Sequence, residues 1–284
     1  MTNLNTLGEH ACFGGTVSFH EHHSSACDAD MRFAAYVPPL AAGGPVPVLY
    51  YLAGLTSTEE TFMTKGGAQR LASEHGLMLV AADTSPRGLG LPGEDDDWDF
   101  GSGAGFYLDA TVEPWSRHYR MGTYVTSELP AVVAEHFPAS GARGIFGHSM
   151  GGHGALTLAL KNPDLYASVS AFAPVSAPTR APWGHKVFSG YLGPDEKLWS
   201  EHDASELVRR LPFPDGRGIL VDQGTVDEFL EEQLYPEVFA EACREAGQPL
   251  TLRWHEGYDH SYYFISTFLE DHVRHHAEVL TGTA

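Results

Sequence analysis

The sequence predicts an α/β fold with a mostly parallel central sheet, antiparallel strands near the N-terminus and helices on both faces. Residues 16–20 and 31–37 alternate apolar and polar side chains, as half-exposed antiparallel strands do. Continuous apolar runs follow, and helical patterns separate them, as expected for parallel strands covered on both faces. These runs are residues 46–52, 77–82, 143–146, 168–173, 218–222 and 250–254.

Helical patterns fill the gaps between these strands. The expected helices are one that opens after Thr58 as its cap, one over 124–137, one over 228–246 that ends at Gly247, and one over 261–280. Pro130 predicts a kink or break in the second helix, because proline cannot donate a backbone hydrogen bond. The last helix is rich in histidine near its C-terminal end, where positive charge favours the helix dipole.

Bulk properties favour a single domain over residues 1–284, with no repeat or linker evident. The net charge of −20 argues against nucleic-acid and membrane partners. No apolar run is long enough to span a membrane, and no signal peptide is apparent. Three cysteines, Cys12, Cys27 and Cys243, are expected to be buried or unreactive free thiols in a reducing, cytoplasmic setting. Two long stretches, 86–120 and 173–214, are expected to be irregular and to wall the active site.

Residues 147–151, Gly-His-Ser-Met-Gly, carry the strongest functional signal. The strand-like run 144–146 precedes them and a helical pattern follows. A serine on a sharp strand-to-helix turn projects its hydroxyl out of the sheet, and flanking glycines let the backbone pass closely. The setting therefore predicts the nucleophile elbow of an α/β-hydrolase fold, with Ser149 as nucleophile.

A serine nucleophile needs a histidine base and an orienting carboxylate, and in this fold the chain order is Ser, acid, His. After the last predicted strand, His260 lies on a loop before the final helix, which favours it over His255 at the strand end. After the preceding strand, Asp227 lies on a loop. Asp222 and Glu228 stay as alternatives for the acid, with Asp222 more suited to hydrogen bonding loop amides.

Two backbone N–H groups should stabilise the oxyanion of a tetrahedral intermediate. Met150 follows the nucleophile and supplies one of them. The second is expected from the loop after strand 46–52, where Leu55 follows the flexible Gly54. A plain turn that leads into the Thr58 cap is the structural alternative for this loop.

The chain resembles the S-formylglutathione hydrolases, the esterase D family, over nearly its whole length from Gly14 to His276. The matching segments are residues 54–56, 83–88, 98–101, 103–107, 146–155, 170–174 and 256–264. The resemblance implies the triad Ser149, Asp227 and His260, in agreement with the choice made from the residues. It differs at Ser57, where some members carry a cysteine, so we expect lower sensitivity to thiol reagents.

The resemblance further implies hydrolysis of the thioester S-formylglutathione to glutathione and formate, a step of formaldehyde detoxification. No metal and no organic cofactor is needed for such a reaction, and family members are often homodimers. Glutathione is a net anion, so local cations matter on this acidic chain. The candidate cations are Lys65, Arg87, Arg117, Arg120 and Lys186, and the candidate pocket walls are Trp98, Tyr107, Trp183 and Phe188.

Two other motifs resemble metal sites, but the sequence gives them little support. The run from His20 to His23 looks like a metal cluster, but no further ligand set is evident. The acidic run at Asp95–Asp97 lacks the spacing of a calcium-binding loop.

A broad carboxylesterase for short acyl esters is the main functional alternative. A catalytically dead hydrolase fold that serves as a binding module is the other, and the intact Ser-Asp-His set argues against it.

Overall fold

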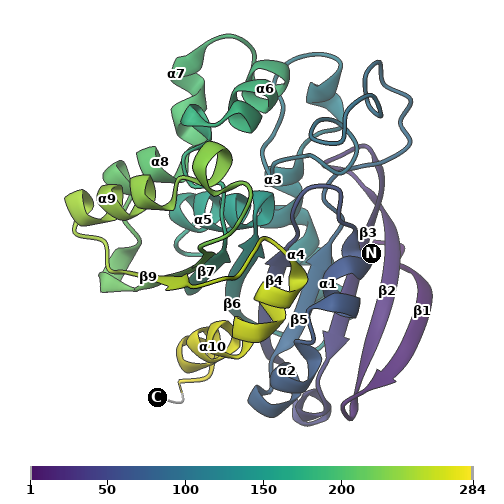
Figure 1. The fold of residues 1–284 in the computed structure, drawn as a ribbon. Coiled ribbons are helices and arrows are strands. Elements are labelled where there is room, and N and C mark those ends of the chain that lie inside the picture. The colour runs from purple at the N-terminus through teal and green to yellow at the C-terminus, as the bar shows by residue number, and fades with distance from the viewer. Residues whose placement is uncertain (1, 283–284) are drawn as a thin grey trace.

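The structure, a computed structural model, describes residues 2–282, and one nine-stranded sheet runs through them (Figure 1). The strands are β1 (Asn5–Cys12), β2 (Gly15–Ser24), β3 (Ala29–Val37), β4 (Val46–Leu52), β5 (Met78–Ala82), β6 (Ala139–His148), β7 (Ser168–Phe172), β8 (Ile219–Gly224) and β9 (Leu250–His255). Their order in the sheet is β1-β2-β3-β5-β4-β6-β7-β8-β9. Strands β4 to β9 pair in parallel, whereas β1, β2 and β3 pair antiparallel. The predicted α/β class is thus confirmed.

Helices cover both faces of this sheet, as the sequence predicts. They are α1 (Glu59–Lys65), α2 (Gln69–His75), α3 (Met121–Thr123), α4 (Leu129–His136), α5 (Met150–Lys161), α6 (Pro182–Tyr191), α7 (Glu196–Trp199), α8 (Ala204–Arg210), α9 (Pro236–Ala246) and α10 (Tyr262–Thr281). Helices α1, α2 and α10 pack on one face, and α5, α8 and α9 pack on the other (Figure 1). None of the helices within residues 2–282 combines the length and apolar character needed to cross a membrane.

The carboxyl ends of the parallel strands share one edge of the sheet, where the predicted site residues lie. Helices α6 and α7 and the segment 86–120 lie beyond this edge, at the top of Figure 1. Segment 86–120 is mostly irregular, as expected. The expectation for 173–214 was wrong, because this stretch forms α6, α7 and α8.

The helix expected over 124–137 is interrupted close to Pro130. A π-helical turn spans Tyr124–Glu128, and the Leu129 N–H bonds to the Tyr124 carbonyl before α4 begins. Pro130 then occupies the first turn of α4, where its missing N–H costs no intrahelical hydrogen bond. The predicted break is therefore confirmed, and the π turn is the form that it takes.

The prediction of one helix over 228–246 was wrong for the first half of this range. A π-helical turn covers Leu230–Leu234, Tyr235 adopts a left-handed conformation with φ 51°, and α9 begins at Pro236. The proline explains this break, because a residue that precedes proline is disfavoured in the helical region. The predicted C-terminal end is confirmed, with Gly247 at φ 67°.

The histidines of α10 do not supply the positive charge that the sequence suggested. His272 and His276 are fully buried, and burial lowers the pKa of both below its usual range. Each accepts or donates a hydrogen bond with Ser170 Oγ, at 2.8 and 2.9 Å. These rings are therefore neutral members of the core rather than partners of the helix dipole.

Candidate active site

Ser149 occupies the sharp turn between β6 and α5 that the sequence predicts. Its backbone has φ 58° and ψ −120°, a conformation that is rare for a residue with a side chain. A Cβ atom on Gly147 would lie 2.2 Å from the Gly151 carbonyl oxygen, and one on Gly151 would lie 1.9 Å from the Leu52 oxygen. Both neighbours must therefore be glycine for the elbow to pack against β4.

Asp227 and His260 meet although they lie 33 residues apart. The Asp227 Oδ2 atom is 2.6 Å from His260 Nδ1, and its Oδ1 accepts a hydrogen bond from the Phe229 N–H at 2.9 Å. Gln223 Nε2 donates to Oδ2 as well, at 3.2 Å. The carboxylate is fully buried, so it is held in one orientation and fixes the imidazole tautomer that carries its proton on Nδ1.

His260 is joined to the elbow through the ring of His148, which directly precedes Ser149. The two imidazole centroids are 4.3 Å apart. Burial, with a smaller contribution from His260, lowers the pKa of His148 well below its usual range, so that this ring is neutral. The structure records no hydrogen bond between Ser149 Oγ and His260 Nε2 among residues 2–282. In proteins without substrate, such contacts are often long and tighten on binding.

The loop after β4 lies directly against the elbow. A Cβ atom on Gly54 would be 3.2 Å from Ser149 Cβ and 3.3 Å from His148 Nδ1, so only glycine allows this approach without displacement. Within residues 2–282, neither the Leu55 N–H nor the Met150 N–H has a recorded protein acceptor. The loop therefore leaves two donors beside Ser149.

Two of the predicted substrate contacts instead hold this loop. The Tyr107 hydroxyl is buried and donates to the Ala53 carbonyl at 2.8 Å. Arg87 pairs with Asp83 at 2.8 Å and donates to the Ser57 carbonyl at 3.0 Å. Both side chains thus act on the backbone of residues 53–57, and Arg87 has its charge neutralised by Asp83.

An aromatic wall borders His260. The Phe229 ring meets the His260 ring edge to face at 4.9 Å, Trp183 lies 4.8 Å from Phe229, and Trp98 lies 5.7 Å from Trp183. Trp98 is 56% exposed, whereas Trp183 is buried. Phe188, the fourth predicted wall residue, is fully buried, so the structure does not bring its ring to an exposed surface.

Four of the five candidate cations form ion pairs. Arg87 pairs with Asp83, Arg117 with Asp28, Arg120 with Asp109, and Lys186 with Asp97 and Asp99. Lys65 differs, because its recorded contact is with an aromatic ring: its Nζ lies 5.9 Å from the centroid of Tyr262. It is exposed at the end of α1.

The alternative acid Asp222 has a separate set of partners. It is fully buried, and Arg253 contacts it through two nitrogens at 2.6 Å each. Burial raises the pKa of Asp222, but contacts with His272 and Arg253 outweigh burial and lower it to about 2. His255, the alternative base, lies 3.3 Å from the same carboxylate. The expectation that Asp222 hydrogen-bonds to loop amides was wrong, because its carboxylate contacts the side chains of Arg253 and His255.

Three neighbours of the predicted triad were missed from the sequence. They are His148, Gln223 and Phe229, which touch His260 or Asp227. His148 lies within the elbow motif and could have been found by its position next to the nucleophile. Gln223 and Phe229 carry no sequence signal of their own, because their role depends on how the loop after β8 folds back.

Several other groups lie apart from this site. His20 and His22 are buried and bond to Ser18 Oγ and Tyr124 Oη respectively. Within the described part of the chain, no cluster of three or more His, Cys, Asp or Glu side chains could hold a metal ion. Burial raises the pKa of the Cys27 thiol to about 11 and that of Cys243 to about 12.

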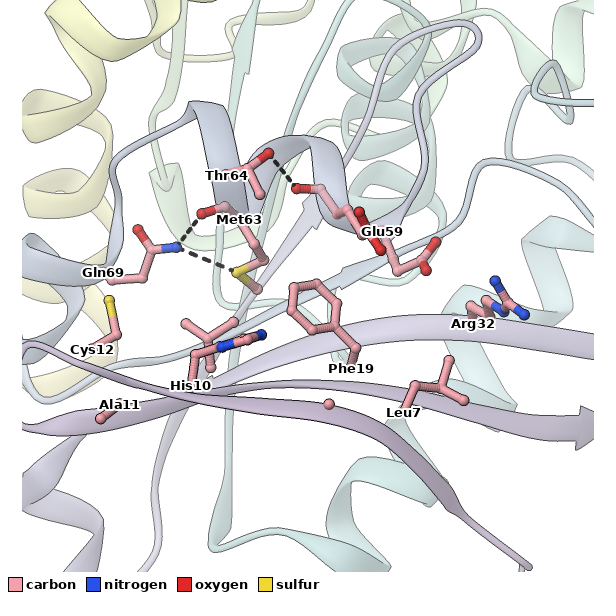
Figure 2. Close-up of a pocket in the computed structure, with 13 residues that line it drawn as sticks. Leu7, His10, Ala11, Cys12, Phe19, Arg32, Glu59, Met63, Thr64 and Gln69 are labelled. Atoms are coloured by element: carbon pink, nitrogen blue, oxygen red, sulfur yellow. Dashed lines mark hydrogen bonds between the residues drawn. The ribbon is translucent and has the colours of Figure 1, made fainter.

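A pocket of about 520 Å³ lies between the β1–β2 strands and α1. Figure 2 shows Phe19 and Met63 at its centre, with Glu59 and Arg32 toward one end and Gln69 toward the other. None of the predicted site residues lines it. It is therefore a feature of the N-terminal strands, separate from the elbow.

The sheet order, the strained serine at the β6–α5 turn and the acid and histidine loops after β8 and β9 define an α/β-hydrolase. A family model described as putative esterase matches residues 24–275. The chain belongs to this esterase family and, within it, to the S-formylglutathione hydrolases.

Relatives from distant organisms carry that name. The S-formylglutathione hydrolase of Mus musculus is 54% identical over 281 residues, which cover 98% of this chain and 99% of the relative. The solved S-formylglutathione hydrolase of Agrobacterium tumefaciens superposes with a TM-score of 0.94 at 51% identity, and covers 97% of this chain and 99% of its own. The Staphylococcus aureus serine hydrolase FphF shares the fold, with a TM-score of 0.72 at 19% identity over 93% of this chain and 98% of its own.

Proposed function

We propose that this protein hydrolyses S-formylglutathione to glutathione and formate, with Ser149 as nucleophile, His260 as base and Asp227 as the orienting acid. The observation that carries the proposal is the 2.6 Å contact between Asp227 and His260 beside the elbow that presents Ser149. The names of the mouse and Agrobacterium relatives support the choice of substrate.

In the acylation half of the reaction, Ser149 Oγ attacks the formyl carbon while His260 Nε2 takes its proton. Asp227 accepts the Nδ1–H of His260 and stabilises the imidazolium that forms. The Leu55 and Met150 N–H groups bind the oxyanion. Collapse of the tetrahedral intermediate then expels the glutathione sulfur, a good leaving group, which takes the proton from His260 Nε2 and leaves as the thiol. A formyl-serine ester and a neutral His260 remain.

Deacylation uses the same groups in a second cycle. His260 Nε2 takes a proton from water, and the resulting hydroxide attacks the formyl ester. The oxyanion again lies against the two backbone donors. Collapse releases formate and returns the proton from His260 to Ser149, so neither half of the reaction requires a group beyond the protein and water.

The side chains near His260 suit a small acyl group. Phe229 and Trp183 narrow the space beside the imidazole, and the exposed Trp98 offers a surface for the peptide part of the leaving group. Lys186 is held by Asp97 and Asp99 next to Trp98, so its charge is already balanced. Within this proposal the tryptophans contribute contact area. The cation that binds the carboxylates of glutathione must be a residue other than Lys186.

The test is the Ser149→Ala variant, assayed with S-formylglutathione. Removal of the nucleophile should lower kcat by several orders of magnitude, on the order of 10⁴-fold or more, while the fold persists. Ser266→Ala, on the exposed face of α10, is the matched control and should keep wild-type activity. Retention of most activity by Ser149→Ala would refute the proposed role of this serine.

A broad carboxylesterase is the second candidate, and the aromatic wall favours it. Trp98, Trp183 and Phe229 could contact an aryl leaving group as readily as a peptide. The ratio of kcat/KM for S-formylglutathione to that for 4-nitrophenyl acetate separates the two. A ratio well above one supports the thioesterase, and a ratio below one supports the carboxylesterase.

The biological setting follows from the proposed reaction. Hydrolysis of S-formylglutathione would complete the thioester stage of formaldehyde detoxification. A cytoplasmic location and a homodimeric assembly stay predictions. Sedimentation analysis of the purified protein tests the assembly, and fractionation of cells of its source tests the location.

A further inference from the structure

Lys65 stands out among the cations near the predicted site. Its ammonium lies 5.9 Å from the centroid of the Tyr262 ring, and within residues 2–282 no carboxylate lies within ion-pair distance of it. The side chain is exposed at the last residue of α1. A lysine held over an aromatic face keeps its charge and its hydrogen-bond donors available to a ligand.

Tyr262 connects this lysine to the groups around Ser149. Its hydroxyl lies 3.2 Å from that of Tyr51 on β4, the strand that leads into the Gly54–Leu55 loop. Its ring lies 6.2 Å from that of His148, which in turn packs against His260. Tyr262 also opens α10, two residues after His260. Lys65 therefore lies on the side of the site bounded by the His260 loop and the end of β4.

Asp259, the carboxylate nearest to Tyr262 in the chain, is engaged elsewhere and does not pair with Lys65. Asp259 Oδ1 accepts from the Ser261 N–H at 3.0 Å and from the Ser261 hydroxyl at 2.5 Å, so it is turned toward the α10 cap. Within residues 2–282, two other exposed cations, Arg180 and Lys197, form no ion pair, and neither contacts Tyr262, His148 or His260.

We propose that Lys65, seated on Tyr262, forms an anion subsite that binds a carboxylate of the glutathionyl leaving group. The inference rests on the proposed function and adds the group that recognises the charged part of the substrate. The protein carries a net charge of −20, so an anionic substrate needs a local cation that is not already neutralised. Among the five cations that the sequence offered near the site, Lys65 meets this requirement.

This subsite acts on binding and not on chemistry. The carboxylates of glutathione are remote from the thioester, so their interaction with Lys65 is the same before and in the transition state. Loss of such an interaction raises KM and leaves kcat nearly unchanged. It leaves hydrolysis of a neutral ester untouched, because that substrate has no carboxylate to bind.

The experiment measures kcat and KM for S-formylglutathione and for 4-nitrophenyl acetate with the wild type, Lys65→Gln and Lys65→Arg. Lys65→Gln should raise KM for the thioester by about 5- to 30-fold, as expected for one charge-assisted hydrogen bond. Its kcat, and both constants for the ester, should stay within about twofold. Lys65→Arg keeps the charge and should recover most of the affinity.

Salt and a modified substrate identify the charge involved. A rise from about 0.02 to about 0.2 M salt should raise the wild-type KM for the thioester more than that of Lys65→Gln, because screening acts on the exposed charge. Esterification of the glycyl carboxylate of S-formylglutathione should abolish the difference between the two proteins if that carboxylate is the ligand. If the difference persists, the γ-glutamyl carboxylate is the ligand.

Matched controls separate this subsite from general effects. Lys197→Gln and Arg180→Gln remove other exposed cations and should leave both substrates unaffected. An unchanged KM in Lys65→Gln, an equal loss on thioester and ester, or a larger loss in Arg180→Gln would overturn the subsite. A wild-type protein that does not hydrolyse S-formylglutathione would instead refute the proposed function, so the two failures are distinct.

Discussion

His148 packs its neutral imidazole against the ring of His260, with the two centroids 4.3 Å apart. The residue before the nucleophile thus supports the residue that is proposed to activate it. Gly54, on the opposing loop, lies close to the Nδ1 side of the same ring. His148 is therefore enclosed between the loop with the predicted oxyanion donors and the predicted base.

This contact predicts a positioning role for His148. The His148→Ala variant should lower kcat for S-formylglutathione by about 10- to 100-fold, because a small displacement of His260 from its line of attack is costly. KM should change little. His148→Phe keeps the ring that packs against His260 and should restore part of the rate. The His148 Nε2 atom has no hydrogen-bond partner within residues 2–282, whereas the hydrogen bond of His148 with the His260 backbone would be lost. If phenylalanine is as damaging as alanine, the ring nitrogens of His148 take a direct part.

Gly54 provides a second test of how the loop approaches the elbow. In Gly54→Ala the new Cβ atom would lie 3.2 Å from Ser149 Cβ, so the loop must retreat and carry the Leu55 N–H away from the oxyanion. We expect kcat to fall by about 100- to 1,000-fold, the usual cost of one lost oxyanion donor. Gly43→Ala is the control, because no atom of residues 2–282 lies within 4 Å of its new Cβ, and it should keep full activity.

Asp222 and Asp227 lie five residues apart, yet their substitutions should have different effects. One should lower mainly the stability of the protein and the other mainly its catalytic rate. Asp227→Asn disturbs the partner of His260 and should lower kcat by on the order of 10⁴-fold, with a small change in stability. Asp222→Asn breaks the buried pair with Arg253 and should lower the free energy of unfolding by about 3 kcal/mol. Its folded fraction should retain kcat within severalfold.

Urea unfolding and initial-rate assays on both variants check this division. Arg253→Gln removes the other half of the Asp222 pair and should destabilise the protein by a similar amount. If Asp222→Asn lost activity as severely as Asp227→Asn while remaining folded, Asp222 would have to be reconsidered as the acid.

Much of the fold could be predicted because its parallel strands are buried on both faces and therefore form continuous apolar runs. Strand β1 was missed for the opposite reason. Most of its side chains are exposed, and it is held by backbone pairing with β2 rather than by an apolar pattern. The segment 173–214 was misjudged because its helices are short and are stabilised by burial of Trp183, Phe188 and Trp199 in tertiary contacts.

The predicted triad came from the order of loops in the chain, which is a local property of strand ends. The surrounding groups depend on distances that the sequence does not contain. Nothing near Arg87 in the sequence indicates that it supports Ser57, and nothing near Lys65 indicates that Tyr262 lies under it. The ion pairs in particular could not be predicted from the sequence, because their partners can be far apart in the chain. Arg117, for example, pairs with Asp28, which lies 89 residues away.

The buried histidines predict how stability depends on pH. Burial lowers the pKa of His153 and of His202 to about 3, and lowers those of His148, His272 and His276 below the usual value near 6.5. In the unfolded chain these rings bind protons below about pH 6.5, whereas in the folded protein they stay neutral. Their contribution to stability is thus complete above about pH 6.5 and is lost progressively as the pH falls toward the folded-state values.

Urea unfolding at about pH 7.5, 6 and 5 should therefore show a steep fall in the free energy of unfolding, approaching about 1.4 kcal/mol per pH unit for each such histidine well below its unfolded pKa. Replacement of His202 by glutamine removes one titrating group and should make the fall less steep. Ser266→Ala, on the exposed face of α10, removes no titrating group and should leave the slope as it is. A free energy of unfolding that stays constant between about pH 7.5 and 5 would contradict the neutral, buried state of these rings.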